Sequence, residues 1–173
     1  MINGSVFRLQ NIVSLIEACR YGIHDISRVQ LDSASHLPRF NMPFELGVFY
    51  GAKQLGLLKH QKKECIIFEK EKYRYQQFLS DIAGIDVSPH DNNPHVLMLA
   101  VREWLATASR RTSIPQGTDI VNRYISFEKC IKRICKIRSY NYNDMSFIEI
   151  VRNMTDWLKL NQANTTPLIS GRP

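Results

Sequence analysis

Apolar residues recur along the chain at two different periods. In segment 8–19 they fall at helical spacing, which predicts an amphipathic helix. Shorter apolar runs at 21–27 and 64–69 are typical of buried strands. The stretch 28–41 between them is polar and irregular, so we expect a loop. The apolar positions of the first helix are Leu9, Ile12, Val13, Ile16 and Cys19.

The second half of the chain reads mainly as helix. We predict helices over 71–83, 94–108, 118–138 and 144–160, with a loop at 84–94. Together with the first half this gives the order helix, strand, loop, helix, strand, helix. That order is typical of a parallel sheet with crossover helices, and therefore of the α/β class.

The helix that follows the first loop has clear boundary signals. Asn41 or Met42 is expected to cap it, and Pro43 suits the first turn because its missing N–H has no helical partner there. Glu45 is placed in the same turn, where a carboxylate complements the positive helix end. The helix should end near Gly56.

Two carboxylates are predicted to meet at one edge of this sheet. Asp25 lies at the end of the first strand and Glu45 at the start of the next helix. In open parallel sheets, ligands bind beyond the carboxyl ends of the strands, near helix N-termini. We therefore expect both to face one crevice. The predicted neighbours are Ser27, Asn41 and the backbone amides around Phe44, with Arg28 and Arg39 placed to meet phosphates.

The segments YGIHDIS (21–27) and FNMPFELGVFYGAK (40–53) resemble the nucleoside 2-deoxyribosyltransferase-like and TIR-like superfamily. In that superfamily a strand with an acidic or hydroxyl end leads through a loop to an ELG helix start. The match covers about residues 8–70. It implies a small flavodoxin-like or TIR-like parallel sheet. It also implies that Glu45 is the catalytic carboxylate at the ribosyl C1′, and that Asp25 orients a sugar hydroxyl or the nucleophile.

The resemblance has one departure and sets the expected domain limits. Members begin with a strand, but only Met1–Phe7 precede the first predicted helix, and those residues are weak strand material. The sheet is therefore either small or lacks its first strand. We expect an α/β region at 1–112, a helical extension packed on it at 113–162, and a frayed tail at 163–173.

These features favour a nucleotide-directed N-glycosidase or ribosyl-transfer enzyme, with NAD, a nucleoside or a nucleotide as substrate and without metal or cofactor. The alternative is a nucleotide-sensing or protein-interaction module of the same fold that does not catalyse. The later helices leave open whether they close the core or form a homo-oligomer.

Charge and composition bear on the partners. The net charge of +7, from 23 basic and 16 acidic residues in 173, suits a third alternative, a nucleic-acid-binding domain. The basic runs lack interleaved aromatic residues, which makes that alternative the weaker one. No apolar stretch suits a membrane span and no signal peptide is evident, so we expect a cytoplasmic protein.

Overall fold

The computed structural model describes residues 4–29, 31, 33, 36 and 38–161, and the side chains from residue 8 onward. The chain divides into two compact units, Met1–Gly117 and Thr118–Pro173, which we describe separately as unit 1 and unit 2. The predicted frayed tail at 163–173 lies outside the described residues.

Unit 1 is built on a small parallel sheet, which confirms the predicted α/β class. Strands β1 (Tyr21–Asp25), β2 (Glu64–Glu69) and β3 (Val87–Pro89) lie in the order β1-β2-β3. In the first pair Tyr21 lies opposite Glu64, and in the second Glu69 lies opposite Pro89. All three strands run in one direction, so their carboxyl ends share one edge of the sheet.

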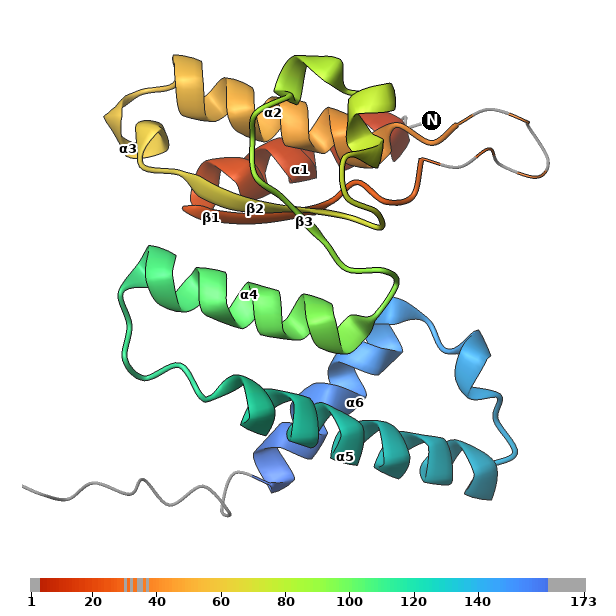
Figure 1. Cartoon of the computed structure of the whole chain (residues 1–173). Helices are drawn as coiled ribbons and strands as arrows, with labels where there is room; N and C mark the ends of the chain where they lie inside the picture. Colours follow the sequence, from red (N-terminus) through yellow and green to blue (C-terminus); the bar gives the residue numbers. More distant parts are fainter. Residues whose placement is uncertain (1–3, 30, 32, 34–35, 37, 162–173) are drawn as a thin grey trace, which may run out of the picture. The chain divides into compact units, whose positions relative to one another are not determined.

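Helices cover both faces of this sheet (Figure 1). Helices α1 (Gly4–Ala18) and α2 (Asn41–Leu55) lie on one face and α4 (Pro94–Ser109) on the other, while the short α3 (Leu58–Gln61) leads into β2. In strand β1, side chains alternate between the two faces of the sheet, so that they contact helices on both sides. The ring of Tyr21 contacts Trp104 of α4, whereas the ring of His24 contacts Phe49 of α2. The buried core joins Ile26, Leu46, Ile67 and Tyr75.

The connection from β2 to β3 differs from the prediction. The expected helix at 71–83 is two 3-10 turns, η1 (Arg74–Gln77) and η2 (Ser80–Ile82). Tyr73 has φ 64°, a left-handed conformation that interrupts a helix just before η1. Tyr75 is buried in the core and Phe78 packs against it, whereas Tyr73 is 59% exposed. Strand β3 was predicted as loop, because three residues are too few to show a period.

The start of α2 also corrects the prediction. Its N-cap is Phe40, and no side chain caps it, so neither Asn41 nor Met42 is the cap. Asn41 is the first helical residue, and Glu45 is therefore the fifth, beyond the first turn. The stabilisation by the helix dipole that we expected for Glu45 falls off over that distance. The predicted end at Gly56 is confirmed, because Gly56 is the C-cap.

A buried lysine joins α1 to the sheet. Lys63, immediately before β2, is only 2% exposed. Its ammonium group donates to the carbonyl oxygens of Ile16 and Cys19 at the end of α1. It also lies 5.4 Å from the ring centroid of Phe49. A cation suits this position because the last carbonyls of a helix carry partial negative charge.

Unit 2 contains helix α5 (Gly117–Ile137) except for its first residue, and helix α6 (Phe147–Leu160), separated by the 3-10 turn η3 (Tyr142–Asp144). Its core is formed by Phe127, Ile131 and Cys135 of α5, with Trp157 of α6 packed against them. Helix α6 begins with a capping box, in which Ser146 and Glu149 bond reciprocally. This motif explains why α6 begins at 147 rather than at the predicted 144.

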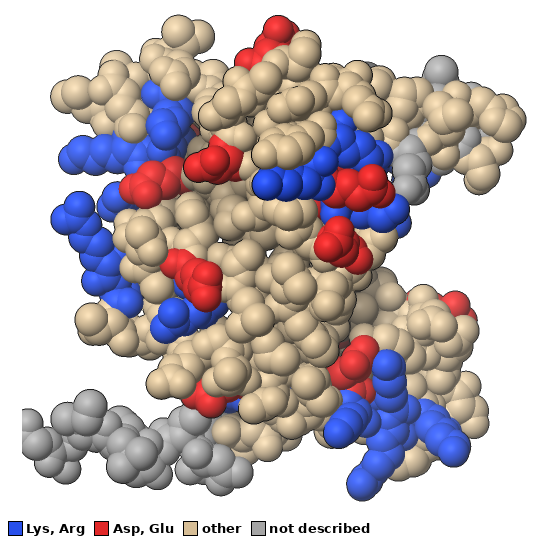
Figure 2. Space-filling view, viewed as in Figure 1, with Lys and Arg blue, Asp and Glu red and all other residues tan. Residues whose placement is uncertain are grey.

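The surface and the helices carry two further observations. In Figure 2 the Lys and Arg side chains on the face in view form separate small groups, with Asp and Glu beside most of them. Across the part of the chain that the structure describes, no helix combines the length and apolarity needed to cross a membrane.

Candidate functional site

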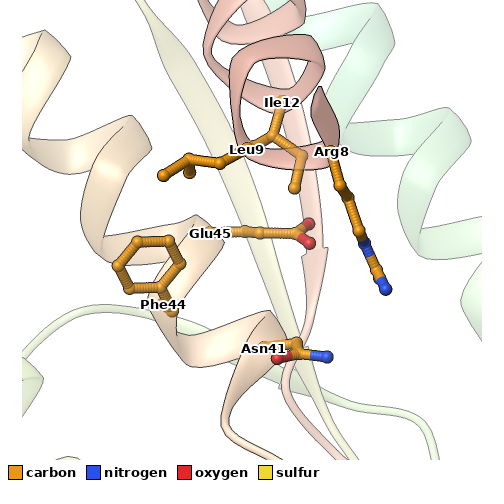
Figure 3. Close-up of a pocket in the computed structure, with 6 residues that line it drawn as sticks. All are labelled: Arg8, Leu9, Ile12, Asn41, Phe44 and Glu45. Carbon is orange, nitrogen blue, oxygen red and sulfur yellow. The ribbon is translucent and has the colours of Figure 1, made fainter. Parts of the chain in front are cut away.

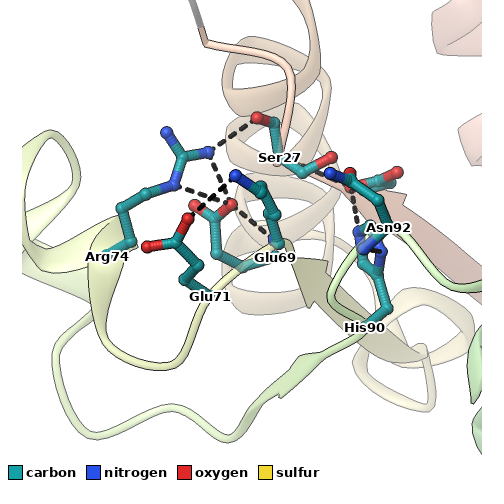
Figure 4. Close-up of polar contacts among 8 residues, drawn as sticks. Ser27, Glu69, Glu71, Arg74, His90 and Asn92 are labelled. Atoms are coloured by element: carbon teal, nitrogen blue, oxygen red, sulfur yellow. Dashed lines mark hydrogen bonds and ion pairs between the residues drawn. The ribbon is translucent and has the colours of Figure 1, made fainter.

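Polar residues gather where the three strands of unit 1 end. Asp25 ends β1, Glu69 ends β2, and His90 follows β3. Backbone bonds continue the sheet there, since His90 N donates to Glu69 O at 3.0 Å. With Ser27 and Arg74 these residues form what we call the sheet-edge cluster (Figure 4). The parallel topology therefore brings together side chains up to 65 positions apart.

A buried ion pair forms one half of the cluster. The side chain of Glu69 is fully buried, and its Oε1 accepts from Arg74 Nη2 at 2.6 Å and from Arg74 Nε at 3.2 Å. Arg74 Nη2 also donates to the carbonyl oxygen of Ser27 at 2.6 Å. Arg74 thereby fixes the backbone that follows β1. Among the described residues, Glu69 Oε2 has no hydrogen-bond partner.

A histidine and an aspartate form the other half. His90 Nδ1 accepts from Asn92 N at 3.1 Å, which assigns the proton of a neutral ring to Nε2. His90 Nε2 lies 3.5 Å from Asp25 Oδ1, longer than a typical N–H···O bond. Asp25 Oδ1 accepts from Ser27 N at 3.0 Å. Both His90 Nε2 and Ser27 Oγ are buried without a hydrogen-bond partner among the described residues.

These residues border a hollow of about 180 Å³, which we call the sheet-edge hollow. Helix α4 begins beside it, but the side chain of Asn93 caps that helix by accepting from His95 N at 2.9 Å. The chemistry of the hollow therefore comes from its side chains rather than from open helix amides. Its lining includes Asp25, Ser27, Arg28, His90, Asn93 and Leu97.

A second hollow, of about 290 Å³, lies between α1 and the start of α2, and we call it the Glu45 hollow. In Figure 3 the carboxylate of Glu45 points into this space on the side of Arg8. Glu45 is half-buried, and within the described part of the chain no hydrogen bond or ion pair engages its carboxylate. The lining is Arg8, Leu9, Ile12, Asn41, Phe44 and Glu45.

The structure divides the predicted site residues between these two hollows. Asp25, Ser27 and Arg28 line the sheet-edge hollow, and the two linings share no residue. Arg39 lines neither hollow. The amide of Phe44 is bonded to Phe40 O at 2.9 Å, so it is not open to a ligand as we expected. The residues lining the Glu45 hollow that were predicted for the site are Asn41, Phe44 and Glu45.

Three members of the sheet-edge cluster were not predicted as site residues. Glu69 is the last residue of an apolar run that was predicted as a buried strand. An acidic residue at that position could have indicated a functional site. Arg74 lies in segment 71–83, which we wrongly predicted as one helix. His90 stands in a segment read as loop, and only the presence of β3 brings it to the sheet edge.

Other titratable groups have structural roles. Burial lowers the pKa of His24, whose ring lies 5.0 Å from that of Phe49, and His24 lines neither hollow. Burial, with the nearby Cys65 thiol, raises the pKa of Tyr50 to about 12. In the part of the chain that is described, no group of three or more His, Cys, Asp or Glu is placed to hold a metal ion.

Unit 1 is thus a small α/β protein with a three-stranded parallel sheet and polar residues gathered at the carboxyl edge. Comparisons with protein-family models, with curated proteins and with solved structures found no match.

Proposed function

We propose that this protein cleaves or transfers the N-glycosidic bond of a nucleoside or nucleotide such as NAD, with Glu45 as the reacting carboxylate. The observation that carries the proposal is the half-buried carboxylate of Glu45, which faces a hollow and has no partner among the described residues. The resemblance of residues 40–53 to the ELG helix start supports the same role for Glu45.

The other walls of the Glu45 hollow suit a nucleotide. The ring of Phe44 is 54% exposed and offers a surface on which a base can stack. The guanidinium of Arg8 offers a phosphate contact, and the amide of Asn41 offers both donors and an acceptor. Leu9 and Ile12 supply apolar surface. A hollow with these groups can orient a nucleotide against one carboxylate.

The chemistry follows from the charge that develops on the sugar. When the bond between C1′ and the base nitrogen breaks, the base leaves with the electron pair and the ring becomes cationic. The carboxylate of Glu45 stabilises that cation or forms an ester with C1′. Water then supplies the new C1′ oxygen in hydrolysis, and a second nucleobase supplies a nitrogen in transfer.

The test is base release by the full chain from NAD and a panel of nucleosides and nucleotides, followed by chromatography. Glu45→Gln keeps the shape of the side chain and removes the charge, so we expect release to fall by a factor on the order of a thousand. Glu103→Gln, at an exposed position of α4, is the matched control and should retain full activity. Release that persists in Glu45→Gln would remove Glu45 from the catalytic role.

One observation favours a second candidate, a nucleotide-binding module without turnover. Retaining glycosidases place two carboxyl groups about 5–5.5 Å apart. Here Glu45 is the only acidic side chain among the described residues that line its hollow, and Asp25 lines the other one. A nucleotide that raises the melting temperature of the full chain without being consumed would establish this candidate instead.

The proposal extends to location and assembly. The four cysteines are free thiols, which supports a cytoplasmic location because reducing compartments keep thiols unpaired.

Three leucines around the end of α2, Leu55, Leu57 and Leu58, are 90%, 79% and 77% exposed. Neighbouring apolar side chains with such exposure support a homo-oligomer.

A further inference from the structure

Strand β1 has a neighbouring strand on one side only. The sheet order is β1-β2-β3, so β1 forms one lateral edge of the described sheet and β3 forms the other. The β3 edge is three residues long and ends with Pro89, which has no N–H to offer to a further strand. The β1 edge is five residues long and contains no proline or lysine, the residues that commonly block edge pairing. The sheet can therefore be extended at β1.

The bonds between β1 and β2 determine which backbone groups point outward. Ile26 N donates to Phe68 O at 2.9 Å, so Ile26 faces β2. Backbone groups of successive residues point to opposite sides of a strand, so those of Tyr21, Ile23 and Asp25 point away from β2. In the described part of the chain, no hydrogen bond engages the outward N–H and C=O groups of these three residues. They form a ready template for one more strand.

A second copy of β1 complements this template. In an antiparallel pair centred on Ile23, that residue lies opposite Ile23 of the second copy, and Tyr21 lies opposite Asp25. Each of these pairs exchanges both of its hydrogen bonds, because all three residues point outward. A register shifted by two residues keeps only two such pairs. The strand is thus self-complementary, as a two-fold interface between identical chains requires.

The side chain of Ile23 supports the same register. Ile23 lies on the α4 face of the sheet together with Tyr21, because side chains alternate along a strand. Helix α4 leaves it 55% exposed. The centred register places the Ile23 side chains of the two copies next to each other, so the pairing removes apolar surface from water on both.

Opposite charges also meet in this register. Asp25 comes to lie beside Tyr21 of the second copy, and Arg20 of that copy directly precedes Tyr21. The Cζ atom of Arg20 lies 5.0 Å from the ring centroid of Tyr21, so its guanidinium is held near that position. The side chains of Arg20 and Asp25 are 53% and 40% exposed, and both are therefore accessible to a second copy. Such matching of charges favours a second copy over an arbitrary peptide.

We propose that the protein forms a homodimer in which β1 pairs antiparallel with β1 of a second copy around Ile23, which joins the two sheets into one. The inference names the interface of the homo-oligomer proposed above, and it does not depend on glycosidic chemistry at Glu45. In this dimer Arg20 of the second copy lies next to Asp25, so each copy contributes a cation beside the sheet-edge hollow of the other.

The test is sedimentation velocity of the full chain over a concentration series. Pairing of five-residue strands is a small contact, so the measured mass should rise from one chain to two as the concentration increases. Ile23→Lys places two ammonium groups opposite each other and should weaken dimerisation at least about tenfold. The fold should persist, because the Ile23 side chain is more than half exposed, and circular dichroism checks this. Ile23→Thr is β-branched and uncharged, and as the matched control it should still dimerise.

Amide hydrogen exchange, followed by NMR, locates the interface. At a concentration where the dimer predominates, the outward amides of Tyr21 and Asp25 should exchange at least about tenfold more slowly in the wild type than in Ile23→Lys. The amide of Ile26 is bound to Phe68 O within each copy and should exchange alike in both proteins. Equal exchange at Tyr21 and Asp25 in the two proteins would overturn the inference.

Leu57→Ser separates the β1 edge from the exposed leucines around the end of α2, and it should leave the dimer intact. Dimerisation that is kept in Ile23→Lys but lost in Leu57→Ser would place the interface at those leucines and overturn the inference. A wild-type chain that stays monomeric at every concentration would overturn both the inference and the homo-oligomer. Base release and its loss in Glu45→Gln would still decide the proposed chemistry, because that assay does not require a dimer.

Discussion

The buried pair of Arg74 and Glu69 makes a quantitative prediction. Arg74→Met should lower the free energy of unfolding of unit 1 by about 3–5 kcal/mol. The variant leaves a carboxylate inside the protein without its cation. The Glu69 side chain is 0% exposed and that of Arg74 is 22% exposed, so water cannot replace the guanidinium at Oε1.

The same chain offers a matched exposed pair. Arg20 Nη2 lies 2.9 Å from Glu64 Oε1, but these side chains are 53% and 39% exposed. Arg20→Met should therefore cost no more than about 1 kcal/mol, because water solvates the carboxylate that is left. The two variants remove the same kind of contact, and the difference between them measures the effect of burial.

The assay is urea unfolding at neutral pH, with fluorescence as the signal. Trp104 packs against Tyr21 at 5.9 Å within unit 1, and Trp157 belongs to the core of unit 2. A Trp157→Phe background therefore reports unit 1 through Trp104.

A double variant at Glu69 and Arg74 completes a double-mutant cycle, which measures the interaction between the two residues. Glu69→Met together with Arg74→Met should cost about 2 kcal/mol less than the sum of the single variants, because the residues interact directly. A cost below 1 kcal/mol for Arg74→Met, or strict additivity in the cycle, would refute the reasoning.

Two further predictions concern groups buried in unit 1. His24 has a lowered pKa because it is buried, so the unfolded chain binds a proton near the ordinary value of 6.5 while the folded chain does not. The stability contributed by neutral His24 is therefore present above about pH 6.5 and is lost as the pH falls below it. His24→Leu should flatten that dependence in urea titrations between pH 7 and 5. Equal slopes in wild type and His24→Leu would contradict this. Lys63→Met should destabilise unit 1 by about 2 kcal/mol, since two charge-assisted bonds at the end of α1 are lost and only part of that loss is offset by removing a buried cation; unchanged stability in thermal unfolding would show that the ammonium does not hold α1.

The strongly patterned parts of the fold were accessible from sequence. The runs that became β1 and β2 are apolar and clearly bounded, and their parallel pairing follows from the helix between them. Strand β3 and the turns before it were missed, because there the tertiary structure decides the backbone. Tyr75 is 4% exposed in the core although it stands in a 3-10 turn, so its burial is no sign of an amphipathic helix.

The site was less accessible than the fold. Asp25 could be placed at a strand end from local pattern alone. Its approach to His90, at 3.5 Å, depends on the position of a three-residue strand 62 or more positions further on. The expectation that Asp25 and Glu45 face one crevice used topology without side-chain directions, and in the structure the two residues line different hollows. Local pattern thus predicts where an element ends, and long-range packing decides which ends meet.

The contact between Lys63 and α1 bears on the order of events during synthesis. The carbonyl groups at the end of α1 are bound by the ammonium group of Lys63, which comes 44 to 47 positions later in the chain. A helix of 15 residues is only marginally stable by itself in water. On the ribosome we therefore expect α1 to remain in exchange with unfolded conformations until both α2, which packs against it, and Lys63 have left the exit tunnel. A chaperone that binds nascent chains would meet the apolar residues of α1 during that interval.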